Sequence, residues 1–116
     1  MTEPLEISEV GAGPRHRVLR LTGTLDSTGA TLLAERSREV LDLSQHLVIN
    51  LARVSFISSS GIGGLVALSE DFRECGLDLR LSAPSPEVMD PIQLLCLDRF
   101  LHICDSDDDA CADWAA

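Results

Sequence analysis

Three consecutive serines, Ser58–Ser60, carry the most distinctive chemistry of this chain. They follow an apolar run, Leu47–Leu51, and they precede Gly61, Gly63 and Gly64. A serine at the start of a helix can accept hydrogen bonds from the unpaired N–H groups there, so a helix cap is one interpretation. A second interpretation is a phosphate site, because an exposed hydroxyl beside the partial positive charge of a helix start can carry or bind that anion.

The apolar residues on either side of the serines predict a strand followed by a helix. The first run is apolar enough for a strand buried on both faces, and Val54, Phe56 and Ile57 extend its apolar character. Beyond the serines the spacing becomes that of an amphipathic helix, with a stripe formed by Ile62, Leu65, Val66, Ser69 and Phe72. We therefore expect the helix to begin near Ser60 and to end at Gly76, a left-handed cap.

The rest of the chain predicts further strands and helices in alternation. Strands are expected at residues 5–10, 15–21, 77–82 and 100–104, and helices open at Asp26 or Ser27, at Ser85 or Glu87, and within Asp105–Asp109. This order predicts one α/β domain over residues 1–116, with a mixed sheet (an N-terminal hairpin and then mostly parallel strands) and about four helices. Right-handed crossovers would place the loops Gly23–Ser27 and Ser58–Gly61 side by side at one edge of the sheet.

Local patterns also predict three details in the last third of the chain. Leucines alternate with Asp78, Arg80 and Ser82, which predicts a strand with one face in water. Pro91 fits a helix only within its first turn. The acidic run Asp105–Asp109 should be a solvated turn, because it lacks the glycine and the glutamate of a calcium loop.

Charge and composition narrow the classes of function. The formal net charge is −10, which disfavours nucleic acid and anionic membranes as partners and favours a partner with a basic patch. All nine basic residues are arginine, so P-loops, Schiff bases and serine–lysine pairs are excluded. The cysteines and histidines match no zinc or nucleophile pattern, and we expect His16 and His46 to be solvated. These observations predict a protein that is not an enzyme and has neither a metal nor a cofactor.

The sequence also shows neither a signal peptide nor a transmembrane segment. No N-terminal segment combines a basic start with an apolar run, and no apolar run approaches the roughly 20 residues of a membrane helix. The four cysteines are most simply reduced thiols. We therefore expect a cytoplasmic protein without membrane insertion.

The segment Leu47–Gly63 resembles the central motif of STAS domains, a family that includes bacterial anti-sigma factor antagonists. The resemblance extends over nearly the whole chain. Its further matches are Gly23–Asp26, Gly76–Leu79, Pro84–Val88 and Leu97–Phe100.

This resemblance implies a small cytosolic switch protein. In such antagonists the unphosphorylated form binds an anti-sigma factor that is a serine kinase, and thereby frees the sigma factor. The phosphorylated form lets go, and a phosphatase resets it. The phosphoacceptor position falls on Ser59, with Ser58 and Ser60 as surrogates. The implied docking face also includes Asp26, Gly61, Ile62 and Leu65.

Two positions depart from the family pattern. The family usually has an aspartate directly before its phosphoserine, where this chain has Ser58, and often an aspartate near the end of the central strand, where it has Asn50. The altered motif keeps a second hypothesis open, namely a docking subunit of a transporter or signalling complex that is not phosphorylated. A weak homodimer also stays open.

Overall fold

The computed structural model describes residues 3–114, and a five-stranded sheet in the order β1-β2-β3-β4-β5 runs through it. The strands are β1 (Glu6–Ala12), β2 (His16–Leu25), β3 (His46–Ile57), β4 (Leu79–Ser82) and β5 (His102–Cys104). β1 pairs with β2 in antiparallel fashion, and the other three neighbouring pairs are parallel. The predicted hairpin followed by parallel strands is therefore confirmed.

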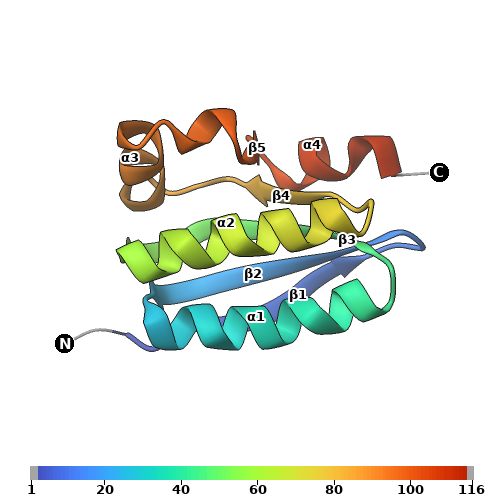
Figure 1. Ribbon diagram of the computed structural model, residues 1–116, viewed down its shortest axis with the longest axis horizontal. Coiled ribbons are helices and arrows are strands. Elements are labelled where there is room, and N and C mark those ends of the chain that lie inside the picture. Colours follow the sequence, from blue (N-terminus) through green and yellow to red (C-terminus); the bar gives the residue numbers. More distant parts are fainter. Residues whose placement is uncertain (1–2, 115–116) are drawn as a thin grey trace.

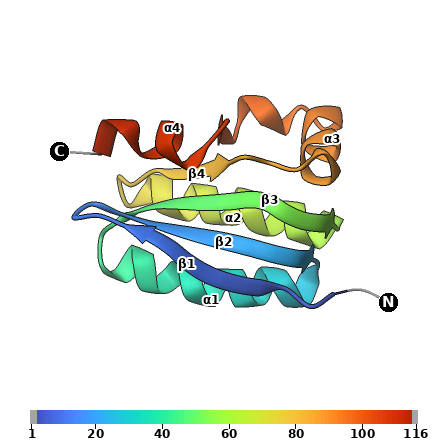
Figure 2. The same cartoon turned by 180° about the vertical axis from the view of Figure 1, so that it is seen from behind.

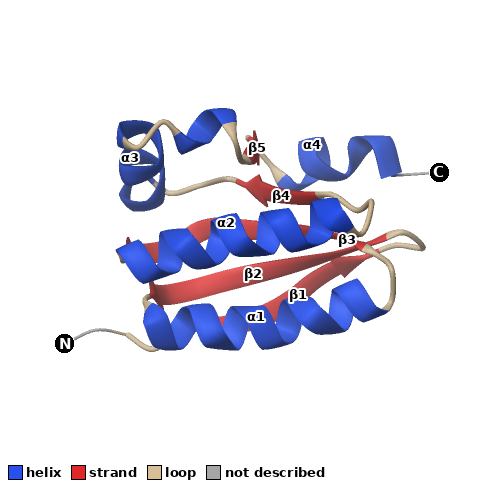
Figure 3. Cartoon of the chain, viewed as in Figure 1, coloured by secondary structure: helices blue, strands red, loops and turns tan. Residues whose placement is uncertain are grey.

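Four α-helices alternate with these strands in the predicted order. They are α1 (Ser27–Asp42), α2 (Ser59–Glu74), α3 (Pro86–Leu94) and α4 (Asp107–Cys111), with 3₁₀ turns at Leu97–Arg99 and Ala112–Trp114. α1 and α2 lie side by side over one face of the sheet (Figures 1 and 3). Seen from behind, β1, β2 and most of β3 are not covered by a helix, and α4 lies near one end of the sheet (Figure 2). None of the helices in the described part of the chain is long and apolar enough to cross a membrane.

The core is aliphatic and lies mainly between the sheet and the α1–α2 layer. Its fully buried members include Leu21, Ile49 and Leu81 from the strands and Leu65 and Phe72 from α2. Burying a side chain of this size contributes roughly 1.5–3 kcal/mol, so this layer supplies most of the stability. A smaller cluster on the other face consists of Val18, Val48, Ala110 and Trp114. The central strand is thus buried on both faces near its start, as predicted.

The second half of β3 does not continue as a simple buried strand. The pairing of β2 with β3 shifts register twice, between Arg20 and Thr22 and between Gly23 and Thr24, and each shift adds one residue to β3. Because of these bulges, the inward residues recur every three positions, at Leu51, Val54 and Ile57. Phe56, which the sequence grouped with the apolar strand, is consequently turned outward and is 51% exposed.

Two expectations for the last third of the chain are wrong. β4 has no wet face, since Arg80 and Ser82 are 5% and 0% exposed beneath the α4 segment. Pro91 lies well inside α3 rather than in its first turn, which Pro86 occupies. The helix tolerates it because the carbonyl that loses its donor belongs to Glu87, an exposed residue that water can reach.

Candidate docking site at the serine turn

The first serine caps α2. β3 ends at Ile57, and Ser58 has an extended backbone with φ −92° and ψ 172°. Its Oγ accepts a hydrogen bond from the N–H of Gly61 at 3.2 Å, and its carbonyl accepts from Ile62 at 3.0 Å. The helix therefore begins at Ser59, one residue before the predicted start near Ser60, and Ser58 is its cap.

The hydroxyl groups of the next two serines face solvent. Ser59 and Ser60 are both exposed, and neither hydroxyl has a hydrogen-bond partner among residues 3–114. The first turn of α2 holds no acidic residue. A group attached to either hydroxyl would therefore face water and the positive end of the helix, without a carboxylate from the same turn beside it.

The loop before α1 lies against this turn, as the chain order predicted. The N–H of Ser58 donates to the carbonyl of Leu25 at 3.0 Å. A Cβ atom at Gly61 would overlap that same carbonyl oxygen, so only glycine allows this close approach. Asp26 follows directly and caps α1, with its Oδ1 accepting from the N–H of Gly29 at 2.9 Å. The starts of α1 and α2 thus share one edge of the sheet, on the side where α3 also lies (Figure 1).

The first half of α2 carries only small side chains on its outward side. Ser59, Ser60, Gly63 and Ala67 are all exposed and recur at helical spacing, and we call this set the flat stripe. A Cβ built at Gly63 would meet no atom within 4 Å, so nothing in the described chain requires glycine there. Glycine inside a helix costs about 0.5–1 kcal/mol relative to alanine. The sequence alone did not single out this position, although its signal, a helix glycine with no packing role, becomes visible once the fold is known.

Two residues of the implied docking face point inward instead. Ile62 is 8% exposed and Leu65 is fully buried, so their side chains join the core and fix the position of α2. Gly61 is buried as well, against Leu25. The surface that another protein could touch here is therefore the flat stripe together with the Asp26 loop. A hollow of about 220 Å³ beside this loop lies between Glu3–Leu5 and the start of α1.

Asn50 does not belong to this edge. Its Nδ2 donates to Oδ1 of Asp107 at 3.0 Å, and its own Oδ1 accepts from the N–H of Ala52 at 3.0 Å. The hydroxyl of Ser82 donates to the same Oδ1 of Asp107. The expectation that Asp107 lies in a solvated turn is therefore wrong. Its carboxylate instead bonds α4 to β3 and β4. Asn50 thus supplies a donor to a carboxylate on the other face of the sheet, which an aspartate at this position could not do.

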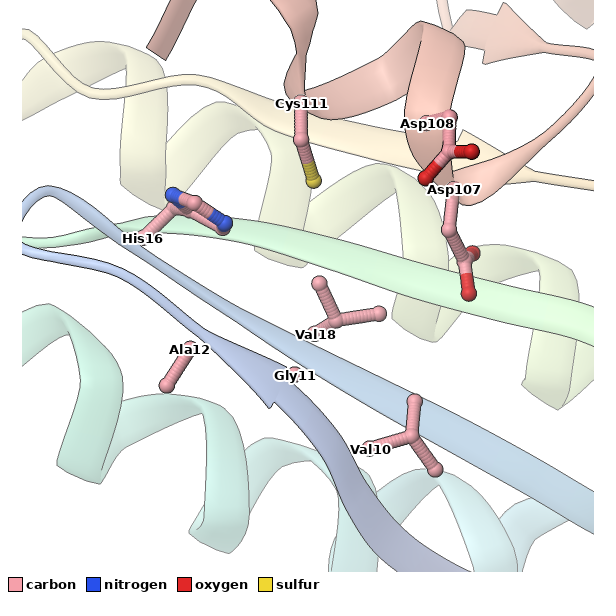
Figure 4. Close-up of a pocket in the computed structure, with 8 residues that line it drawn as sticks. All are labelled: Val10, Gly11, Ala12, His16, Val18, Asp107, Asp108 and Cys111. Carbon is pink, nitrogen blue, oxygen red and sulfur yellow. The ribbon is translucent and has the colours of Figure 1, made fainter. Parts of the chain in front are cut away.

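A second cavity lies away from the serines. It measures about 300 Å³ and opens between the β1–β2 hairpin and α4, with His16, Asp107, Asp108 and Cys111 on its walls (Figure 4). Burial raises the pKa of the Cys111 thiol, which therefore stays protonated at neutral pH and is a poor nucleophile. Within residues 3–114, no three histidine, cysteine, aspartate or glutamate side chains are grouped so as to hold a metal ion.

Comparison with known proteins identifies the class. The pattern that defines the STAS domain matches residues 9–110, which is most of the chain. The mixed sheet, the four helices and the serine turn described above agree with that match, and this chain belongs to the STAS domain family.

Solved structures give more specific likenesses. An anti-sigma factor antagonist from Mycobacterium paratuberculosis is 25% identical, with a TM-score of 0.79 over 94% of this chain and 92% of that one. The anti-sigma factor antagonist SpoIIAA in its unphosphorylated form is 20% identical, with a TM-score of 0.77 over 96% and 98%. Murine Slc26a9, an anion transporter, is 20% identical, with a TM-score of 0.67 over 84% of this chain but 17% of the transporter.

Proposed function

We propose that this protein is an anti-sigma factor antagonist, a binding protein without catalytic activity whose partner contact is switched by phosphorylation of Ser59. The observation that carries the proposal is the exposed, unpartnered hydroxyl of Ser59 on the flat stripe. The 25% identity to a mycobacterial antagonist over nearly the full chain supports the same role. The proposed partners are an anti-sigma factor with serine kinase activity and a phosphatase, both acting in the cytoplasm.

The geometry favours Ser59 among the three serines. The Oγ of Ser58 is occupied as the cap of α2, so a phosphate there would disturb the bond that starts the helix. Ser59 is free of such a task and holds the position two residues before Gly61 that the family uses. Ser60 is equally exposed and remains the surrogate acceptor.

A phosphate on Ser59 would change the charge of the flat stripe. It adds a charge of about −1.5 to −2, and the helix dipole stabilises an anion there by about 0.3–1 kcal/mol. With Ser58 in place of the family's aspartate, no carboxylate adjoins the phosphate in the first turn. The chain itself therefore holds the modification readily, whereas a partner packed against the stripe would have to desolvate it. The expected result is release of the partner.

Phosphorylation itself is tested by incubating the protein with serine kinases of its own host and ATP, followed by peptide mass spectrometry. We expect phosphate on Ser59, and none on that peptide in Ser59→Ala. Ser58→Ala serves as the matched control and should still be modified. Phosphate found only outside Ser58–Ser60 would overturn the proposed switch.

The docking surface is tested separately at Gly63. Gly63→Ala adds one methyl group in open space, and Gly63→Arg adds a long side chain at the same place. In pull-downs from host lysate, Gly63→Ala should retain the partner recovered by the wild-type protein, whereas Gly63→Arg should lose it without a loss in thermal stability. Retention of the same partner by Gly63→Arg would show that the flat stripe is not the contact surface.

A docking subunit without phosphorylation is the second candidate. It is supported by the likeness to a domain that makes up part of an anion transporter, and by the replacement of the family's aspartate with Ser58. Recovery of a transporter ATPase in the pull-down, together with an absence of phosphate on Ser58–Ser60, would favour this candidate over the antagonist.

A further inference from the structure

The C-terminal segment Asp107–Trp114, which we call the C-terminal clamp, is fastened to the start of β3 and to β4 by an aromatic and ionic cluster. Trp114 is 6% exposed, and its ring stacks on the His46 imidazole with centroids 4.5 Å apart and planes 4° apart. The guanidinium carbon of Arg80 lies 3.9 Å from the Trp114 ring centroid. The expectation that His46 is solvated is therefore wrong, because the clamp packs on it.

Arg80 donates three hydrogen bonds to the clamp and one to Asp78, and its Nε has no partner among residues 3–114. Its Nη1 donates to the carbonyl of Ala110 at 2.7 Å and to Oδ1 of Asp113 at 3.0 Å. Its Nη2 donates to Oδ2 of Asp113 at 2.8 Å and to Oδ2 of Asp78 at 3.2 Å. The hydrogen bonds from Arg80 lower the pKa of Asp113 to about 2, so this ion pair stays charged throughout mildly acidic conditions.

His46 is the histidine whose ring stacks directly on Trp114, whereas the His16 ring lies farther away, with its centroid 5.7 Å from that of the indole. Its Nδ1 accepts the N–H of Asp78 at 3.0 Å, which requires the neutral imidazole with its proton on Nε2. Burial lowers its pKa, and the positive groups that face it, Arg80, His16 and Arg15, act in the same direction, against the opposing effect of the Asp78 carboxylate. The remaining neighbour, Trp114, carries no charge.

We propose that protonation of His46 loosens the C-terminal clamp, which makes the clamp an acid-sensitive latch on the sheet. Protonated Nδ1 cannot accept the Asp78 N–H, and the new imidazolium sits in a cluster that already holds the Arg80 guanidinium. A histidine of lowered pKa contributes its stability above the unfolded pKa of about 6.5, and that contribution is lost as the pH falls toward the folded value. The clamp is therefore closed at neutral pH and opens in mild acid.

Trp114 is the single tryptophan of the chain, so its fluorescence reports this latch directly. On titration from pH 7.5 to 5, we expect the wild-type emission maximum to shift to longer wavelength as the indole enters water. His46→Asn places an amide oxygen near the former Nδ1 and cannot titrate, so its maximum should not shift. His102→Gln removes an exposed histidine of β5 and should shift like the wild type. A constant wild-type maximum, or the same shift in His46→Asn, would overturn the proposal.

A protonated histidine can quench a neighbouring indole without any movement, so a second readout is needed. Hydrogen exchange of the Ala110–Trp114 amides in the wild-type protein, corrected for intrinsic rates, should show lower protection at pH 5.5 than at pH 7.5. The amides of α2 in the same sample are the internal control and should keep their protection. Unchanged protection in both segments would overturn the latch, irrespective of how the variants fold.

Discussion

The two ends of β3 differ in how they are covered: the start, which we call the sealed end, lies under the C-terminal clamp, and the other, the open end, leads into the exposed serine turn. At its start, His46 lies under Trp114, and the surrounding polar groups pair with one another through Arg80. At its end, roughly 35 Å away at about 3.3 Å per residue, the Ser59 hydroxyl and Gly63 face open space. The sealed end buries a ring and a guanidinium beneath Trp114, although Arg80 Nε and His16 Nδ1 have no partner among residues 3–114, whereas the open end presents small, exposed side chains. The first end therefore fastens the C-terminal clamp to the sheet, and the second is the surface that we propose for partner contact.

The largest expected effect is on the sealed end. Arg80→Met would keep most of the side-chain volume but remove four hydrogen bonds and the cation over Trp114. We expect a loss of about 2–3 kcal/mol in the free energy of unfolding, measured by urea denaturation, because the buried carbonyl of Ala110 loses its donor and Trp114 loses the guanidinium. Arg99→Met, at an exposed arginine of the 3₁₀ turn, is the control and should change stability little. Equal stability of Arg80→Met and the wild type would mean that the clamp is only loosely attached.

A pair of glycine variants sharpens the comparison at the open end. Gly61→Ala forces a methyl group against the Leu25 carbonyl and should cost about 2 kcal/mol. Gly63→Ala meets nothing and should stabilise the helix by about 0.5–1 kcal/mol. Thermal unfolding of both variants measures the difference. Two equal destabilisations would contradict the assignment of Gly61 to packing and Gly63 to the surface.

Asn50→Asp tests the match between the central strand and the clamp. The new carboxylate would face Asp107 and should cost about 1–2 kcal/mol at pH 7. Because repulsion raises the folded pKa of this pair above the unfolded value of about 3.9, the cost should appear as the pH rises above about 4 and vanish below it. Denaturation at pH 7 and pH 4, with His46→Asn present in every variant so that the clamp stays closed, measures this, and Asn50→Asp/Asp107→Asn should regain stability. A deficit that is the same at both pH values would exclude the carboxylate pair as its cause.

The smallest expected effect separates the cap from the switch. Ser58→Ala removes the acceptor for the Gly61 N–H and should cost about 1 kcal/mol. Ser59→Ala removes an unpartnered hydroxyl and should leave the unfolding midpoint nearly unchanged. Parallel thermal melts measure the two values, and the reverse order would show that the hydroxyl of Ser59, not that of Ser58, caps α2.

The two ends of β3 also differ in how well the sequence predicts them. The open end follows local signals, because the Asp26 cap, the strand-to-helix change and the chain order are all encoded by neighbouring residues, and the predicted adjacency of the two loops is confirmed. The sealed end depends on contacts between residues 33 and 57 positions apart, Arg80 with Asp113 and Asn50 with Asp107. An alternating pattern predicts a wet face for β4 because it carries no information about a later segment that covers it.

The proposal that a negative charge at Ser59 releases the partner is most directly tested by changing only the charge of this side chain. Ser59→Asp and Ser59→Asn have nearly the same size and differ in one negative charge, and both should fold like the wild type because this side chain has no partner among residues 3–114. Titration against the anti-sigma factor kinase recovered with the wild-type protein should give wild-type affinity for Ser59→Asn and at least a several-fold loss for Ser59→Asp. Equal affinities for the two variants would contradict a charge-operated switch at the serine turn.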